Sequence, residues 1–298
     1  MLRFPYHTDP PIGVRQGTAA QRFYDVAYAP APNAPAAIPD REAAAKEEIY
    51  LRIATDVAEK LGVKPVMAGF VNQYGLADKR VLDVGSGQGY LQDLVADYTG
   101  LDISGTVRRF YHKPFVRASA TEMPFHDDQY DAIWSIWVME HVPNPEQMLS
   151  EMRRVVKPGG LIYLHPAWYC TPWAAEGYAV RPYRDFGFRG KLIKAALPLV
   201  ASPMLDVLGR HPTRFLRWAG SKLPPGPTRF HYRLLRPNYD QYWMADSDAL
   251  NSMDPYEAYL WFTTRGDQCL NCGSGWRTFW RTEPGLVIRV HKAGRRES

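Results

Sequence analysis

The amino-acid sequence predicts an α/β fold with a doubly wound, mostly parallel seven-stranded sheet, an antiparallel C-terminal edge hairpin and an inserted lid. Three observations support this prediction. Between residues 76 and 166, short apolar runs alternate with helical patterns. Three glycines follow the first of these runs at alternate positions, in VLDVGSGQG. After residue 166 the alternation stops and returns only near residue 254, which indicates a segment added to the core.

The core segments follow one another as strand and helix. Strands are expected, in chain order, at 80–85, 98–104, 115–119, 130–137 and 159–166. Helices are expected at 90–98, 106–113 and 144–156, the last beginning at Asn144 and Pro145 and stopped by KPGG. Near-continuous apolar strands joined by helices are typical of a parallel sheet covered on both faces. The carboxyl ends of the strands then meet at one edge, where Rossmann-like folds bind their ligands.

The N-terminal part precedes this core in two pieces. Residues 1–40 are rich in proline and alanine, and we expect a mobile arm there. Residues 41–75 are expected to form helices that cover the active site. One is capped by Asp40 and closed by Gly62, and the second begins near Pro65 and ends near Tyr74.

The C-terminal part adds a lid and completes the core. Residues 167–245 are aromatic, broken by prolines and basic, and we interpret them as a substrate lid. Residues 246–298 are expected to supply a helix at 254–266, with Asp254 as its cap, and edge strands at 276–282 and 285–292.

Composition and charge restrict the class of protein. The chain has 298 residues and 46% hydrophobic residues, enough for a packed core, and no apolar run long enough for a spanning helix. The proline-broken N-terminus is a poor signal peptide. Between residues 179 and 236 the net charge is +10, so the other residues together carry −5.

The three cysteines, Cys170, Cys269 and Cys272, suit a reducing cytoplasm, where we place the protein. The two cysteines in CLNC are not accompanied by the second pair of ligands that a tetrahedral zinc site would need. They also lack the thioredoxin-like surroundings of a redox site. We therefore expect ordinary thiols and no metal.

The glycine-rich turn points to a ligand at the carboxyl edge. Glycine turns tightly after a strand and lets a ligand approach the backbone. A dinucleotide-binding turn would need G-x-G-x-x-G, but here the spacing is G-x-G-x-G and Tyr90 stands where the third glycine or an alanine belongs. Asp83, just before the glycines, suits a ligand with an ammonium group better than one with phosphates.

At these residues the chain resembles the class I S-adenosylmethionine-dependent methyltransferases of the methyltransferase-11 type. Their first motif is an acidic residue followed by G-x-G-x-G. The resemblance continues in order and spacing over roughly residues 76–166, through LDIS, SATEMPF, YDAIWSIWVMEHVPNPEQMLSEMRRVVKPGG and LIYL.

The resemblance implies S-adenosyl-L-methionine as the cofactor and assigns roles to residues. Asp83 would lie near the methionine ammonium, and Asp102 would accept hydrogen bonds from both ribose hydroxyls. Ser119 stands where the family often has an aspartate that binds adenine. The cofactor site implied in this way consists of Asp83, Gly85, Ser86, Gly87, Gly89, Asp102, Ile103, Ser119, Ala120, Thr121, Met123 and Ser135.

Two histidines are candidates for the general base that a hydroxyl acceptor needs. His141 follows the fourth predicted strand and His165 the fifth, and some sugar and small-molecule O-methyltransferases of this type use a histidine at the first position. Aromatic faces suit sugar rings or planar acceptors. The candidate substrate-binding residues are Trp137, Trp168 and Trp173.

These features favour O-methylation of a sugar or glycoconjugate, and whether this acceptor carries a phosphate or a lipid stays open. A phenolic, polyketide or prenyl natural product, methylated on oxygen or carbon, remains an alternative. A nucleic-acid substrate is a further alternative that we do not expect, because no nucleic-acid module is found. Residues 190–222 mix apolar and basic residues, so they could contact an anionic membrane or form a solvated lid. The sequence leaves the oligomeric state open.

Overall fold

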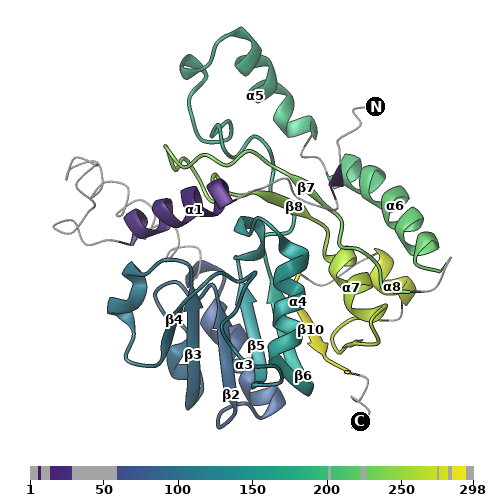
Figure 1. Ribbon diagram of the computed structural model, residues 1–298. Coiled ribbons are helices and arrows are strands. Elements are labelled where there is room, and N and C mark those ends of the chain that lie inside the picture. Colours follow the sequence, from purple (N-terminus) through teal and green to yellow (C-terminus); the bar gives the residue numbers. More distant parts are fainter. Residues whose placement is uncertain are drawn as a thin grey trace.

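The computed structural model describes residues 6–7, 14–28, 59–200, 203–222, 226–273, 275–280 and 284–292. Their main sheet has seven strands in the order β4-β3-β2-β5-β6-β10-β9 (Figure 1). The strands are β2 (Arg80–Val84), β3 (Asp97–Asp102), β4 (Phe115–Arg117), β5 (Tyr130–Ile136), β6 (Val156–His165), β9 (Gln268–Cys269) and β10 (Leu286–Arg289). The first five are parallel, and β10 pairs antiparallel with both β6 and β9. The predicted fold class is confirmed.

Helices cover both faces of this sheet, because alternate strand residues point to opposite sides. On one face, α3 (Val63–Tyr74) buries Met67 and Phe70 in a cluster with Val81 of β2. On the other face, α4 (Pro145–Val155) and α7 (Pro255–Thr263) pack in the cluster that contains Leu82. The predicted caps are confirmed, since the side chains of Asn144 and Asp254 accept hydrogen bonds from the first turns of α4 and α7.

Two of the predicted core helices are wrong. Residues 90–98 contain only the short 3₁₀ helix η2 (Gln92–Leu94), and residues 106–113 contain the 3₁₀ helix η3 (Thr106–Phe110). Strand β3 already begins at Asp97, which pairs with Arg80, and Tyr98 is buried between the sheet and α3. Pairing with β2 thus makes the end of the predicted helix part of a strand, so tertiary structure overrides local propensity.

The predicted strand at 276–282 is also wrong, because Gly275–Trp280 forms helix α8. Phe279 is buried there in a cluster with Tyr256 and Leu260 of α7, a contact across the chain that the local pattern does not reveal. The edge strand of the hairpin is instead β9, with Ile288 of β10 opposite Cys269. The antiparallel edge exists as expected, but a different segment forms it.

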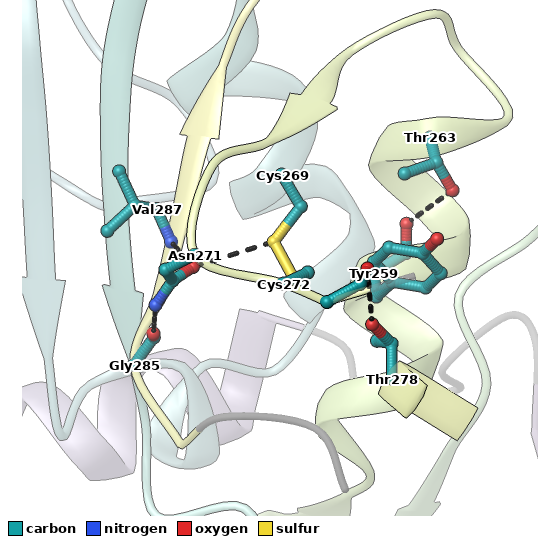
Figure 2. Close-up of a disulfide and its surroundings, with 9 residues drawn as sticks. Tyr259, Thr263, Cys269, Asn271, Cys272, Thr278, Gly285 and Val287 are labelled. Carbon is teal, nitrogen blue, oxygen red and sulfur yellow. Dashed lines mark hydrogen bonds between the residues drawn. A yellow bond between two sulfur atoms is a disulfide. The ribbon is translucent and has the colours of Figure 1, made fainter. Parts of the chain in front are cut away.

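The expectation of free thiols in CLNC is wrong as well. Cys269 and Cys272 form a disulfide, with their Cα atoms 5.4 Å apart (Figure 2). Between them, the Asn271 side chain donates to the carbonyl of Gly285 and accepts from the amide of Val287. These bonds fix the turn after β9 and bring the two cysteines together, which the spacing alone does not reveal.

The segments outside the core form a layer above one edge of the main sheet (Figure 1). A small antiparallel sheet joins β1 (Tyr6–His7), β7 (Tyr232–Leu234) and β8 (Asn251–Met253). Three helices accompany it, namely α1 (Val14–Ala27), α5 (Phe188–Val200) and α6 (Pro203–Gly220). None of the helices in the described residues is long and apolar enough to cross a membrane.

The N-terminal segments depart from their predicted roles. Residues 14–28 belong largely to helix α1, rather than to a mobile arm. Most of the helix expected between Asp40 and Gly62 lies outside the described residues. Helix α3 packs on the face of the sheet and contributes nothing to the pocket described below. Among the described N-terminal segments, α1 is the one whose residues line the pocket.

Candidate functional site

The site is built at the carboxyl edge of β2, β3 and β5, where Asp102 ends β3. One carboxylate oxygen of Asp102 accepts a hydrogen bond from the amide of Gly87, and the other accepts from the amide of Ser104, both at 2.9 Å. Burial raises the pKa of Asp102, while these amides favour its charged form. The loop after β2 and the loop after β3 thus hold one fixed carboxylate between them.

A pocket opens beside this carboxylate. Its walls come from the loops after β2, β3, β4 and β5 and from helix α1. The lining residues are Ala20, Tyr24, Tyr28, Gly85, Leu101, Asp102, Ile103, Ala118, Ser119, Ala120, Trp137, Val138, His141, Val142 and Pro143. Seven residues predicted for the site from the sequence are among them: Gly85, Asp102, Ile103, Ser119, Ala120, Trp137 and His141.

The glycine turn is shaped by close approaches of the protein itself. Gly85 has φ 71°, and a Cβ added there would lie 2.2 Å from a methyl group of Val138. Gly87 has φ 49°, and its Cβ would lie 3.2 Å from the Tyr28 hydroxyl. Both positions therefore favour glycine, for their backbone and for their neighbours. The absence of side chains at these two glycines lets Val138, in the loop after β5, and Tyr28, directly after α1, lie close to the turn at the pocket.

Ser119 occupies the position at which an adenine-binding aspartate was expected. It lines the pocket, and its hydroxyl lies 2.8 Å from the hydroxyl of Thr121. The amide of Thr121 also donates to the Ser119 oxygen. Thr121 thus orients Ser119 from behind and does not itself line the pocket.

The other predicted cofactor residues lie behind the pocket wall. Asp83 accepts a hydrogen bond from the Tyr98 hydroxyl at 2.8 Å, and burial raises its pKa to about 7 although Trp134 and Tyr98 favour the charged form. The Ser86 hydroxyl donates to the carbonyl of Leu101. Buried positions of this kind, which support the pocket without lining it, are Asp83, Ser86, Met123 and Ser135. Gly87 and Gly89 likewise shape the turn and are not part of the lining.

Of the two candidate bases, only His141 lines the pocket. It ends the 3₁₀ helix η4 (Met139–His141), directly after β5. Its Nδ1 is buried and lies 3.4 Å from a carboxylate oxygen of Asp248, and this same oxygen accepts a hydrogen bond from the Tyr24 hydroxyl at 2.6 Å. Tyr24, Asp248 and His141 therefore form a chain from helix α1 to the pocket wall.

His141 has three carboxylates close to it, which is unusual in a buried site. Burial by itself lowers the pKa of the imidazole, but the carboxylates of Asp248, Glu140 and Asp246 outweigh it and raise that pKa. Glu140 is fully buried and its pKa rises to about 7, chiefly because of burial. Asp246 has a φ of 64°, an uncommon backbone for a residue other than glycine.

Ligand atoms of Glu140, His141 and Asp246 lie within 4.8 Å of one another, which would allow a cation between them. An imidazole whose pKa is raised by the neighbouring carboxylates accounts for the same arrangement without a cation. The absence of a metal remains a prediction.

His165 lies at the end of β6 but outside the pocket lining. Its Nδ1 is 3.3 Å from the hydroxyl of Tyr163, and its carbonyl accepts a hydrogen bond from the amide of Trp137. Burial lowers the pKa of His165. No carboxylate contact to its side chain is found among the described residues, so the structure distinguishes it clearly from His141.

The three tryptophans predicted to bind substrate have different surroundings. Trp137 lines the pocket with φ 55°, a conformation that is an outlier for so large a residue. Trp168 is buried in the main core cluster, and its indole nitrogen donates to the carbonyl of Pro284 at 2.5 Å, so its predicted role is wrong. Trp173 is half-buried and not part of the pocket lining.

Because Trp168 is a core residue, we expect Trp168→Ala to lower the free energy of unfolding by about 3–5 kcal/mol. Urea denaturation followed by circular dichroism measures this loss. Trp218→Ala is the matched control, since Trp218 is exposed on α6, and its effect should stay within about 0.5 kcal/mol. Equal effects of the two changes would contradict the assignment of Trp168 to the core.

Several site residues were missed by the sequence analysis. Tyr24 and Tyr28 belong to a segment whose composition indicated an arm, and Asp246 and Asp248 lie far along the chain from His141. The one sequence signal for these residues is the acidic pair in ADSDAL, just before the capped helix α7, which could have been considered as a partner for a basic group.

The basic segment is partly neutralised inside the structure. The guanidinium of Arg214 forms a salt bridge with Asp254 at 2.7 Å, and Arg217 forms one with Glu257 at 2.9 Å. These arginines tie α6 to the beginning of α7. Their charge therefore serves packing between elements, rather than binding phosphate at the pocket.

The comparisons with known proteins concern the core of the chain. The family model described as "Methyltransferase domain" matches residues 82–164. An uncharacterised methyltransferase of Mycobacterium tuberculosis is 36% identical over 116 residues, which cover 35% of this chain and 46% of that protein. The ubiquinone biosynthesis O-methyltransferase of Dechloromonas aromatica is 34% identical over 120 residues, which cover 34% of this chain and 50% of that protein.

Among solved structures, a putative methyltransferase from Bacillus halodurans has 25% sequence identity and a TM-score of 0.32, covering 34% of this chain and 51% of that chain. The match thus spans about half the length of these relatives. It falls on the strands and loops that carry Asp102, Ser119 and His141, whereas α1 and the lid lie outside residues 82–164. Residues 82–164 therefore match a methyltransferase domain, and this match supports the predicted enzyme class and its S-adenosylmethionine cofactor for that part of the chain.

Proposed function

We propose that this chain transfers a methyl group from S-adenosylmethionine to a hydroxyl group of a sugar or glycoconjugate, with His141 as the general base. One observation carries the proposal: His141, backed by Asp248, lines the same pocket as Asp102. A cofactor carboxylate and a base with its own carboxylate partner thus open into one space. This arrangement matches what methyl transfer to oxygen needs.

The residues of the pocket suit the cofactor. Asp102 keeps both of its oxygens beside the pocket on fixed amides, as binding of two adjacent ribose hydroxyls would need. Ala120 and Ser119 offer a small apolar surface and a hydroxyl for the adenine. The residues proposed to contact the cofactor are Gly85, Asp102, Ile103, Ser119 and Ala120. When bound, the cofactor supplies an electrophilic methyl group on its sulfonium.

Residues of the chain would accept the proton of the acceptor hydroxyl and exclude water from the reacting groups. Nε2 of neutral His141 would accept the proton of the acceptor hydroxyl while the oxygen bonds to the methyl group and the methyl–sulfur bond breaks. Asp248, held by Tyr24, stabilises the resulting imidazolium at Nδ1. Helix α1 places Tyr24 and Tyr28 on the pocket wall, and their rings exclude water from the reacting groups.

The charges favour an acceptor that is neutral at its reacting end. Glu140, Asp246 and Asp248 surround His141, and they would repel a phosphate placed next to the base. The rings of Trp137, Tyr24 and Tyr28 form apolar faces of the kind on which a sugar ring packs. A phosphate or lipid carrier would have to lie away from His141. The assignment to the cytoplasm stays a prediction.

The test is methyl transfer from radiolabelled S-adenosylmethionine to a panel of acceptors. The panel holds a neutral glycoside, the same sugar phosphorylated next to its free hydroxyl, a simple phenol and bulk RNA. We expect label in the neutral glycoside and less label in its phosphorylated counterpart. Preferential labelling of the phenol or of RNA would overturn the sugar assignment. If the protein binds S-adenosylhomocysteine but labels none of these acceptors, the proposal that it methylates hydroxyl groups of this kind would be overturned.

A further inference from the structure

Helix α5 presents an apolar face to solvent. Phe188, Leu192 and Leu199 are 80%, 56% and 70% exposed, and they recur at the three- and four-residue spacings that place side chains on one side of a helix. Ala195 completes this stripe between Leu192 and Leu199. Stripes of this kind face the core in globular proteins, so an exposed one indicates a surface that contacts something else.

The opposite side of α5 already has its contacts. Ile193 and Leu197 are half-buried, and the ammonium group of Lys194 donates to the carbonyl of Tyr178. The helix is thus apolar on two sides, of which one faces the protein. Figure 1 shows α5 standing off the body, above the layer that contains α1 and the small sheet. The exposed stripe therefore projects from the molecule instead of closing a cleft.

Positive charges flank this stripe. Lys191 and Arg189 are exposed on α5, on either side of the row that contains Phe188 and Leu192. Arg184, in the turn just before the helix, is also exposed. An apolar row between cations is typical of a helix that lies in the interface of an anionic bilayer.

We propose that the outer face of α5, made of Phe188, Leu192, Ala195 and Leu199 with Arg189 and Lys191 beside them, docks on an anionic phospholipid surface. The apolar side chains enter the boundary between headgroups and acyl chains, and the cations contact lipid phosphates. This contact is independent of methyl transfer, because it needs neither cofactor nor acceptor. It would bring the pocket to acceptors carried on lipids.

Charge decides between a bilayer and a second copy of the chain. Helix α5 carries Arg189, Lys191 and Lys194 and no acidic residue, so two copies placed face to face through α5 would bring like charges together. An anionic bilayer has the opposite sign and complements the same residues. The structure thus favours lipid as the occupant of this face.

The test is flotation of the full chain with two kinds of vesicle, one of phosphatidylcholine alone and one with about a third phosphatidylglycerol. We expect the protein to float with the anionic vesicles at least about ten times more than with the neutral ones, and to lose most of this binding at high salt. Equal recovery with both vesicles, or no flotation with either, would overturn the proposal.

The double variant Leu192→Asp and Leu199→Asp should abolish flotation. Val66→Asp is the matched control, because Val66 is 51% exposed on α3, away from the α5 stripe, and this variant should float like the parent protein. Unchanged thermal unfolding and binding of S-adenosylhomocysteine show that both variants fold. If the double variant still floats, the lipid contact does not lie on α5 and the proposal is wrong. If instead the parent protein forms a concentration-dependent dimer that the double variant does not form, the α5 face binds a second copy of the chain.

Discussion

Asp102→Ala is expected to weaken binding of S-adenosylhomocysteine by about 100-fold, measured by titration calorimetry. The carboxylate would hold two hydroxyl groups, and loss of two charge-assisted hydrogen bonds costs about 3 kcal/mol. The variant also frees the amides of Gly87 and Ser104 from their shared acceptor, which loosens the glycine turn. Both effects act in the same direction.

Two further variants separate binding from folding. Asp102→Asn retains one acceptor oxygen for the loop amides and should lose less affinity than the alanine variant. Asp93→Ala removes an exposed aspartate that pairs with His112 and should bind like the parent protein. If Asp102→Ala bound S-adenosylhomocysteine as tightly as Asp93→Ala does, Asp102 would not be part of the cofactor site.

His141→Ala is expected to lower kcat by about 10²–10⁴-fold while leaving the affinity for S-adenosylhomocysteine unchanged, because a general base acts only in the chemical step. Steady-state kinetics with the best acceptor of the panel measures this change. His165→Ala is the matched control, since His165 lies outside the pocket lining and should change kcat by less than about fivefold. Equal losses in both variants, or a larger loss for His165, would contradict the assignment.

The pH profile gives an independent reading of the same base. Burial lowers the pKa of His141, but Asp248, Glu140 and Asp246 raise it above its ordinary value. A base must be deprotonated, so kcat should rise with pH through a midpoint above that of an ordinary histidine. Removing the Asp248 charge in Asp248→Asn should move this acid limb to lower pH. A limb that stays in place would mean that another group titrates.

The parts of this fold that sequence could predict are those governed by local signals. The strand runs ending at Val84, Asp102 and Ile136 are apolar and short, and their order determines a parallel sheet. The caps at Asn144 and Asp254 are hydrogen bonds within the first helical turn, so the residue at the cap position is enough to predict each of them. For this reason the carboxyl edge, with Asp102 and Ser119 on it, could be located before any coordinates were known.

The parts that sequence could not predict depend on contacts across the chain. Tyr98 is buried in a cluster with residues of α3, and its pairing with Val81 in the sheet makes a strand of a predicted helix end. The Asp248 carboxylate reaches His141 only because β8 and η4 pack together, with the amide of Leu250 donating to the carbonyl of Glu140. Tyr24 and Tyr28 reach the pocket through the docking of α1. No local pattern in these segments specifies those neighbours.

The most direct test of the account is calorimetric titration of the unmodified chain with S-adenosylhomocysteine and, separately, with NAD. The pocket beside Asp102 predicts one site for S-adenosylhomocysteine with micromolar or tighter affinity, and no heat from NAD. Binding of NAD, or no binding of S-adenosylhomocysteine by the folded protein, would contradict the assignment of this pocket to the methyl donor.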